Sequence, residues 1–332
     1  MKKLFTILAV AATLVSCAKD ETIAVNKGEA IQFGNAFVEN STRADAATDP
    51  SYSTTGKGVA LTQFNVYGAV EGVNIFNGNA VTKGEAAYGA AWTLTGAKQY
   101  WIAGADYKFV GVVDGNKTGV TAITPDTAGL PASISYTSDG VTDLLCDVVT
   151  VEDAAAPYKL VAFNYTHLLS KVKFSVKNTT ASDADNYRFV LTSAKLTNAY
   201  ASGVYDVTAK AWDVDEMAGT KEFGLDLLTI NSAATQYHST ELLLLPGASV
   251  GVYVKANIEA SSDNGKTWKV ISDVEKPFSN VVTLAQATAY NFVVELGVGA
   301  EIQFTATTMP EWGNGNTADS DDDDVKDYVP LQ

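Results

Sequence analysis

The feature that most constrains this 332-residue chain is its alternation of apolar and polar side chains, the period of a β-strand with one buried face. The clearest case is the stretch that begins at Val250. Its even-numbered residues up to Ile258 are apolar, and its odd-numbered residues from Tyr253 to Glu259 are polar or amphipathic. Segments 64–70, 107–113, 160–176 and 289–296 are also rich in strand-forming residues. Turn dipeptides follow closely, namely Asn77-Gly78, Asp114-Gly115, Asp139-Gly140 and Asn264-Gly265. Helical periodicity is scarce, so the sequence predicts an all-β protein built from β-sandwiches.

Length and composition predict how the chain is divided. At about 150 residues per domain, a chain of 332 residues predicts two domains. The run Ala154-Ala155-Ala156-Pro157 interrupts two strand-rich halves, which places one sandwich in residues 44–156 and the second in residues 157–316. Residues 317–332 form an acidic tail with six aspartates between Asp319 and Asp327. The tail lacks the spacing and central glycine of a calcium loop, so a solvated tail is favoured over a cation site.

The first residues resemble a secretory signal peptide. Lys2 and Lys3 precede an apolar run that ends at Leu14-Val15-Ser16-Cys17. The run is shorter than the roughly 20 apolar residues of a spanning helix. A cysteine directly after Leu-x-Ser resembles the bacterial lipobox, which predicts removal of residues 1–16 and acylation of Cys17. Several acyl chains hold a protein stably to a bilayer, so the sequence predicts a lipoprotein.

Charge and the scarcity of reactive side chains argue against several functions. The net charge of −15 opposes nucleic-acid binding, which needs a basic surface. There are only two cysteines and two histidines. Cys146 lies in an apolar run and is interpreted as a buried hydrophobe, and His167 lies in a strand pattern and is interpreted as a structural imidazole. No cluster has the spacing of a zinc site. We therefore expect neither enzyme activity nor a cofactor nor a bound metal.

Two short motifs have both a functional and a structural interpretation. Residues 261–268 fit the Asp box of sialidases, Ser-x-Asp-x-Gly-x-Thr-Trp, but only one copy is present, which favours a simple hairpin turn. Residues 247–251 match the nucleophile elbow, Gly-x-Ser-x-Gly. That elbow requires a helix after the serine, whereas here a strand pattern follows. Both motifs are therefore predicted to be turns in a β-protein.

Several separated motifs together resemble the fimbrillin family, the subunits of type V pili in Bacteroides-like bacteria. In chain order they are Ile31-Gln32-Phe33, Ser41-Thr42-Arg43-Ala44, Lys98-Gln99-Tyr100-Trp101 before Tyr107-Lys108-Phe109-Val110, Thr142-Asp143-Leu144-Leu145, Phe163-x-Tyr165-x-His167-x-Leu169-Ser170-Lys171-Val172, Leu244-Leu245-Pro246, and Ile302-x-Phe304 with Trp312. The series covers residues 31–312. It departs from the family pattern at Gly247, where glutamine is expected, and in the Asp-rich extension after Trp312.

The resemblance implies two tandem transthyretin-like β-sandwich domains and a mode of assembly. The precursor would reach the outer membrane surface as a lipoprotein, and an Arg-specific surface protease would cut between Arg43 and Ala44. Leader residues 17–43 would then leave with the first strand, and a strand from the C-terminal region of another pilus subunit would replace it. The chain would become a stalk or tip subunit of an adhesive fimbrium.

The residues give this scheme a physical basis. Ile31, Phe33 and Phe37 fall on one face of a strand expected from Ala30 to Val38. At about 1.5–3 kcal/mol for each buried large side chain, their loss would cost on the order of 5–9 kcal/mol. That is comparable to the whole stability of a domain, roughly 5–15 kcal/mol.

A second function class stays open at this point. A non-polymerising surface lipoprotein could use the many aromatic residues, among them five Trp and fifteen Tyr, to bind a glycan or a protein. A processing site at Arg43 separates the two hypotheses, because a binding protein that is anchored by lipid has no reason to shed its anchor.

Overall fold

The computed structural model describes residues 28–34, 37–38, 63–83, 92–114, 119–180, 186–214, 219–230, 236–238, 241–298, 302–309 and 329–330. These residues form twenty-two strands and no α-helix, which confirms the all-β prediction. Within the described ranges there is accordingly no helix of the length and apolarity that crossing a bilayer requires.

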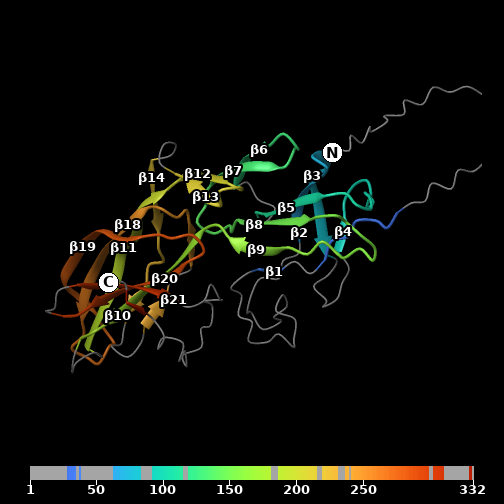
Figure 1. The fold of residues 1–332 in the computed structure, drawn as a ribbon. Coiled ribbons are helices and arrows are strands. Elements are labelled where there is room, and N and C mark those ends of the chain that lie inside the picture. The colour runs from blue at the N-terminus through green and yellow to red at the C-terminus, as the bar shows by residue number, and fades with distance from the viewer. Residues whose placement is uncertain are drawn as a thin grey trace, which may run out of the picture.

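The strands of the first half build two facing sheets (Figure 1). They are β1 (Phe37–Val38), β2 (Gln63–Val70), β3 (Val73–Lys83), β4 (Trp92–Leu94), β5 (Tyr107–Val113), β6 (Val120–Pro125), β7 (Pro131–Thr137), β8 (Leu145–Val151) and β9 (Asn164–His167). A seven-stranded sheet has the order β1-β9-β8-β5-β2-β3-β4, and β6 and β7 belong to a four-stranded sheet. One face of the seven-stranded sheet carries an aromatic core around Phe64 and Phe109, and the other carries Val110 and Val112.

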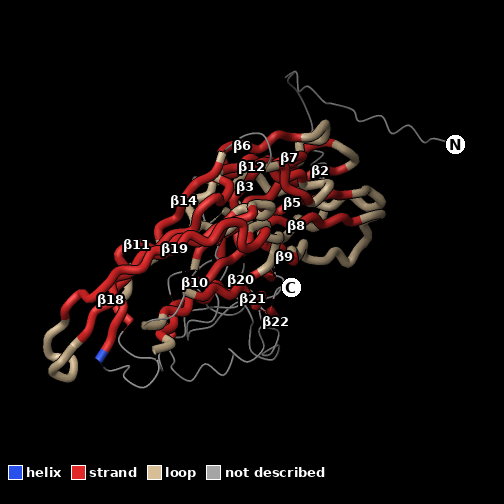
Figure 2. The backbone as a smooth tube through the Cα atoms, turned by 90° about the vertical axis from the view of Figure 1, so that its left-hand side faces the viewer, coloured by secondary structure: helices blue, strands red, loops and turns tan. Residues whose placement is uncertain are grey.

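The strands of the second half build a second sandwich. They are β10 (Ser170–Asn178), β11 (Tyr187–Tyr200), β12 (Ser202–Asp206), β13 (Ala211–Asp213), β14 (Thr220–Gly224), β15 (Thr229–Ile230), β16 (Gln236–His238), β17 (Leu242–Leu244), β18 (Ser249–Ala260), β19 (Lys269–Thr283), β20 (Ala289–Leu296), β21 (Gln303–Met309) and β22 (Val329–Pro330). One sheet contains β16-β10-β20-β21-β22 with β17 beside β10, and the other contains β14-β11-β18-β19 with β15 beside β11. The long strands β11, β18 and β19 run out together to one end of the molecule (Figure 2).

The predicted alternation in β18 is confirmed. Its even-numbered residues from Val250 to Ile258 lie in the core of the second sandwich, while the odd-numbered ones from Tyr253 to Glu259 are partly exposed. The polar face carries cross-strand pairs, for example Lys255 with Glu275 at 3.2 Å. Burial of one face and solvation of the other is what a period of two predicts.

One predicted turn was wrong. Asn77-Gly78 lies inside β3, where the register with β2 shifts, so the pair forms a β-bulge. The turn between β2 and β3 is made by Glu71 and Gly72, with φ angles of 47° and 76°. Glycine at positive φ serves a bulge as well as a turn, here at 73° for Gly78, so the dipeptide alone could not distinguish them.

The two halves are joined by shared strands and a shared core. β12 pairs with β7 in antiparallel register, so the four-stranded sheet β13-β12-β7-β6 contains strands from both halves. Leu245 of the second half packs in one cluster with Leu144 and Ile134 of the first. β9 follows the predicted join at Pro157 and pairs with β8 in the seven-stranded sheet. The domain limits themselves stay a prediction.

Candidate functional site

The site of interest is the place where residues 28–34 attach to the rest of the protein. We call residues 28–34 the N-terminal segment, and we call the residues that contact this segment its bed. On one side Ile31 N donates to Gln99 O and Trp101 N donates to Glu29 O, both at 2.9 Å, in antiparallel fashion. On the other side Val161 N donates to Gln32 O at 2.9 Å and Gly34 N donates to Val161 O at 3.1 Å, in parallel fashion. The segment therefore lies as a strand between two irregular stretches of chain, and these four backbone hydrogen bonds hold it.

Side-chain burial dominates the attachment of this segment. Ile31 and Phe33 are only 4% and 5% exposed. The Phe33 ring lies 5.6 Å from Phe76 and 6.0 Å from Phe109, measured between centroids, in edge-to-face geometry. Phe64 and Phe163 flank it at 6.2 and 6.4 Å. Such pairs contribute about 0.5–1.5 kcal/mol each beyond area burial, so Phe33 is the anchor of the segment.

Two glycines on the seven-stranded sheet make room for this aromatic cluster. A Cβ at Gly68 would lie 2.7 Å from Phe76 and 3.0 Å from Phe109. A Cβ at Gly111 would overlap the Tyr165 hydroxyl and lie 3.0 Å from Phe163. Because both positions lack a side chain, the rings can lie flat against the strands. The bed is thus shaped for a strand with large apolar residues at alternate positions.

The predicted site residues are placed only in part. Ile31 and Phe33 meet in the aromatic core, and the backbone of Phe37 pairs with Asn164 through β1. The side chain of Phe37 lies outside the described residues, as do Cys17, Arg43 and Ala44. The expected continuous strand from Ala30 to Val38 is, in its described part, two isolated bridges followed by the two-residue β1.

The sequence named Trp101 only as part of a family motif, and it did not single out Tyr158 or Val161 as residues that line the bed. Trp101 stacks on Tyr158 with a centroid distance of 5.4 Å and an interplanar angle of 6°. Val161 forms an isolated parallel β-bridge with Phe33, and Val161 is 2% exposed. The aromatic density of residues 98–101 and 158–165 was a signal, but these stretches are irregular, and their pairing with a distant segment has no local pattern.

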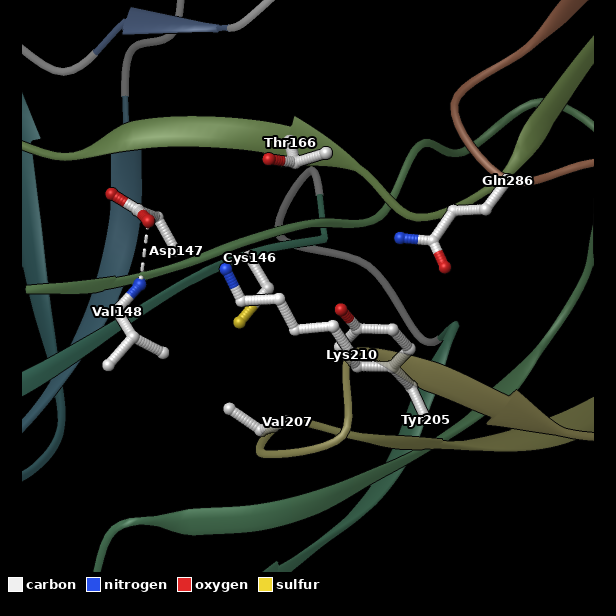
Figure 3. A pocket seen from close by; sticks show the side chains of 8 residues that line it. All are labelled: Cys146, Asp147, Val148, Thr166, Tyr205, Val207, Lys210 and Gln286. Atoms are coloured by element: carbon white, nitrogen blue, oxygen red, sulfur yellow. Dashed lines mark hydrogen bonds between the residues drawn. The ribbon is translucent and has the colours of Figure 1, made fainter.

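The remaining chemical candidates are structural. Burial raises the pKa of the Cys146 thiol to about 12, and the Asp147 carboxylate adds to the effect, so the thiolate is scarce at neutral pH. Cys146 lines a pocket with Lys210, Tyr205 and Gln286 (Figure 3). Its volume of about 50 Å³ is room for a few waters, far below the roughly 300–1,000 Å³ of ligand pockets.

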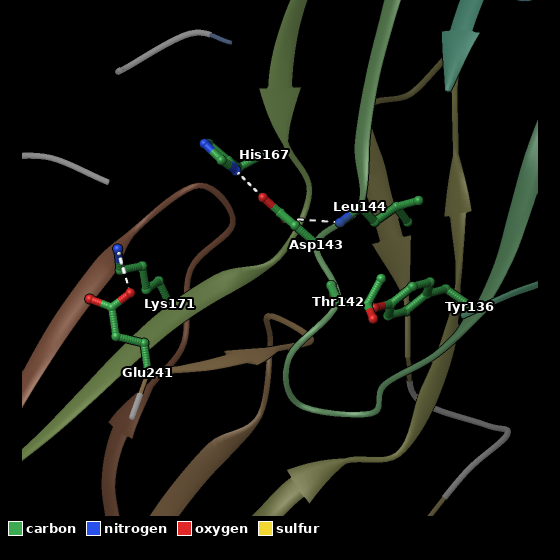
Figure 4. A network of polar contacts seen from close by, with 7 residues as sticks. All are labelled: Tyr136, Thr142, Asp143, Leu144, His167, Lys171 and Glu241. Carbon is green, nitrogen blue, oxygen red and sulfur yellow. Dashed lines mark hydrogen bonds and ion pairs between the residues drawn. The ribbon is translucent and has the colours of Figure 1, made fainter. Parts of the chain in front are cut away.

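His167, at the end of β9, belongs to a network of polar contacts (Figure 4). Its Nδ1 lies 2.6 Å from Asp143 Oδ2, and Asp143 also accepts the Leu144 N–H at 2.9 Å. The His167 side chain is 9% exposed. This geometry is that of a hydrogen-bonded structural imidazole, as the sequence predicted. Within the described ranges no three His, Cys, Asp or Glu side chains converge as metal ligands would.

The Asp-box sequence forms the hairpin turn between β18 and β19. The carboxylate of Asp263 accepts from Thr267 N at 2.8 Å and Thr267 Oγ1 at 2.6 Å. The hydrogen bonds from Thr267, together with the one that the Ser261 hydroxyl donates to the same carboxylate, lower the pKa of Asp263 to about 2. Asn264 and Gly265 take φ angles of 55° and 79° at the tip. The Gly-x-Ser-x-Gly sequence at residues 247–251 begins in the turn at Pro246 and Gly247 and enters β18 at Ser249. A strand therefore follows the serine, and not the helix that a nucleophile elbow requires.

The fold and the bed define a class, an all-β protein of paired sandwiches whose first segment lies in a bed lined by distant loops. The sequence profile of the family described as fimbrillin-like matches residues 42–312. The chain therefore belongs to the fimbrillin-like family, which confirms the resemblance drawn from the motifs. Membership indicates a pilus-related protein of the cell surface with a structural rather than a catalytic role.

Solved structures share the fold. A fimbrial protein from Bacteroides vulgatus is similar with 13% identity and a TM-score of 0.55, over 85% of this chain and 99% of that one. A protein described as a cell adhesion protein from Bacteroides uniformis is similar with 16% identity and a TM-score of 0.54, over 86% and 98% of the two chains. At such identities the likeness shows the fold alone. A search of curated proteins gave no match.

Proposed function

We propose that the chain is a structural subunit, stalk or tip, of an adhesive surface pilus, and that it assembles by donor-strand exchange after cleavage at Arg43. The observation that supports this best is the attachment of the N-terminal segment. Four backbone hydrogen bonds and the buried side chains of Ile31 and Phe33 hold residues 28–34 in their bed. A segment held in this way leaves an apolar vacancy when it departs.

Cleavage lowers the effective concentration of the N-terminal segment at its bed. In the uncut chain the segment is covalently tethered and competes at high effective concentration for its own bed. After cleavage between Arg43 and Ala44 the segment is a separate peptide that dilution removes. The edges at residues 99–101 and at Val161 then lose their partners, and a strand from the C-terminal region of another subunit can replace them.

Before cleavage the subunit is held at the outer membrane by lipid on Cys17. The lipobox-like sequence that ends at Cys17 supports this step. The leader, residues 17–43, would carry the lipid, so cleavage after Arg43 would release the subunit from its membrane anchor. The leader, the Arg-specific protease and the other subunits are the partners that the proposal requires.

Replacing Cys17 with serine should abolish lipidation. The serine hydroxyl is not a substrate for thioether formation, so the variant should appear in the aqueous phase of a detergent partition or remain unprocessed. The measurement is phase partition with mass determination of the N-terminal peptide, and Cys146→Ser is the matched control that should stay lipidated. Lipid found on the Cys17→Ser chain would remove the membrane stage from the proposal.

A further inference from the structure

Two buried polar side chains lie opposite each other on neighbouring strands of the second sandwich. The strands β10 and β20 run parallel, side by side in Figure 1, and Lys173 of β10 is in direct register with Asn291 of β20. Val172 and Phe174 point into the core, so Lys173 lies on the opposite face of the sheet. Lys173 is 5% exposed and Asn291 is 1% exposed. An amine and an amide are thus paired on this face, largely out of contact with water.

The Lys173 amine can reach the amide carbon of Asn291. Neighbouring strands lie about 4.8 Å apart, and residues in register point to the same face. The extended side chain of a lysine is longer than this spacing, so rotation about its side-chain bonds can bring Lys173 Nζ to Cγ of Asn291. A lysine amine is a nucleophile toward carbonyl carbons once it has lost its proton.

Ser175 prepares the Asn291 amide for such an attack. The Ser175 hydroxyl donates to Asn291 Oδ1 at 2.7 Å, and Ser175 is fully buried. Attack on Cγ places negative charge on Oδ1, and a donor that is already aimed at this oxygen in a buried site stabilises that charge. The same hydrogen bond fixes the orientation of the amide, so that Nδ2, the leaving nitrogen, points away from Ser175.

Glu241 adds a carboxylate on the other side of Lys173. Leu242 of β17 is in register with Val172 of β10, and one further step along this antiparallel ladder places Glu241 beside Lys173. Glu241 Oε2 accepts from Lys171 Nζ at 2.8 Å (Figure 4). The other oxygen, Oε1, is buried and has no hydrogen-bond partner among the described residues. A carboxylate oxygen so placed can carry a proton from one nitrogen to another.

We propose that Lys173 and Asn291 are joined by an isopeptide bond that forms in the folded protein. A bond forms between Lys173 Nζ and Cγ of Asn291, and the bond between Cγ and Nδ2 breaks. The attacking nitrogen gives up two protons, which Glu241 passes to the leaving Nδ2, so that Nδ2 departs as an ammonium ion. One ammonium and one amide thus become one secondary amide and one free ammonium ion, and neither an oxidant nor a reductant is consumed.

The bond would be a covalent staple between β10 and β20. The two strands could then not separate even when the backbone hydrogen bonds between them open. The inference concerns the second sandwich alone, so it does not rest on the function proposed above.

Peptide mapping of the full chain tests the bond. Digestion and tandem mass spectrometry should give one branched peptide that contains both Lys173 and Asn291, lighter than the two separate peptides by one ammonia molecule. The branched peptide is the measurement because a succinimide at Asn77-Gly78 or Asn264-Gly265 would also remove ammonia from the intact chain. Unlinked peptides that carry Lys173 and Asn291 would overturn the proposal, and so would a branch at Lys171.

Matched variants identify the reacting groups. Lys173→Arg keeps the positive charge without the amine and should lose the branched peptide, whereas Lys177→Arg should keep it, because Lys177 lies on the same face but pairs with Glu295 at 3.6 Å. Asn291→Asp should form the same bond with loss of water in place of ammonia. Glu241→Gln should slow bond formation on the order of a hundredfold in a refolding time course, the lower range for general acid–base catalysis. A branched peptide in Lys173→Arg, or the parent rate in Glu241→Gln, would contradict these roles.

Discussion

An Arg43→Ala chain should stay lipidated, folded and monomeric, whereas the parent should yield a mature form that begins at Ala44 and joins multimers stable without boiling. The reason is steric, since the bed around Phe33 cannot accept a donor strand while the N-terminal segment fills it. Charge cannot be the switch, because residues 17–43 carry three cationic and four acidic side chains and their loss alters the net charge by one. The measurement is a gel of surface-extracted protein run without boiling, with N-terminal sequencing.

Lys57→Ala is the matched control for Arg43→Ala. It also removes one positive charge from the stretch before β2, and it should leave processing and the ladder of multimers intact. Multimers that form equally well from the uncut Arg43→Ala chain would exclude donor-strand exchange. A parent that never exceeds monomer size would favour the alternative from the sequence, a surface lipoprotein that binds a glycan or protein.

A Phe33→Ala substitution should destabilise the uncut protein by about 3–5 kcal/mol, the range for a large aromatic side chain removed from a packed core. Phe33 is 5% exposed and touches four other aromatic rings. The Arg43→Ala background keeps the chain uncut, and denaturant unfolding followed by tryptophan fluorescence measures the change, with Trp101 in the same cluster. The midpoint of unfolding should move to a lower denaturant concentration.

Gln32→Ala is the control for this experiment. The Gln32 side chain is exposed while its carbonyl accepts from Val161 N, so the substitution keeps the backbone bond and should cost under about 0.5 kcal/mol. Phe33→Ala and Gln32→Ala of equal stability would mean that residues 28–34 do not hold the first sandwich together.

Local pattern was enough to predict what depends on neighbouring residues. The alternation from Val250 to Ile258 predicted both the strand and the buried face, and Asn264-Gly265 predicted the hairpin tip. The burial of Cys146 followed from its apolar surroundings in the sequence. In each case the deciding interactions lie within a few residues of one another.

What could not be predicted depends on partners far apart in the chain. The pairing of β12 with β7 joins residues 202–206 to residues 133–137, and nothing local to either strand specifies it. The N-terminal segment was expected as one regular strand, but its neighbours at residues 99–101 and 158–161 are irregular, and Leu160 lies 3.0 Å from the Cβ position of Gly34. The alternation of Lys171 and Lys173 with Val172 and Phe174 is typical of a strand with one solvated face, yet both lysines are nearly fully buried.

The sheet that both halves share has a mechanical consequence. β12 and β13 of the second half continue the sheet of β6 and β7, and a common apolar cluster lies beneath them. A pull on the two ends of the subunit therefore meets a joint made of backbone hydrogen bonds and packed side chains, in place of a free linker. In a filament of such subunits the bending would concentrate between neighbours, and each subunit would behave as one stiff segment under flow.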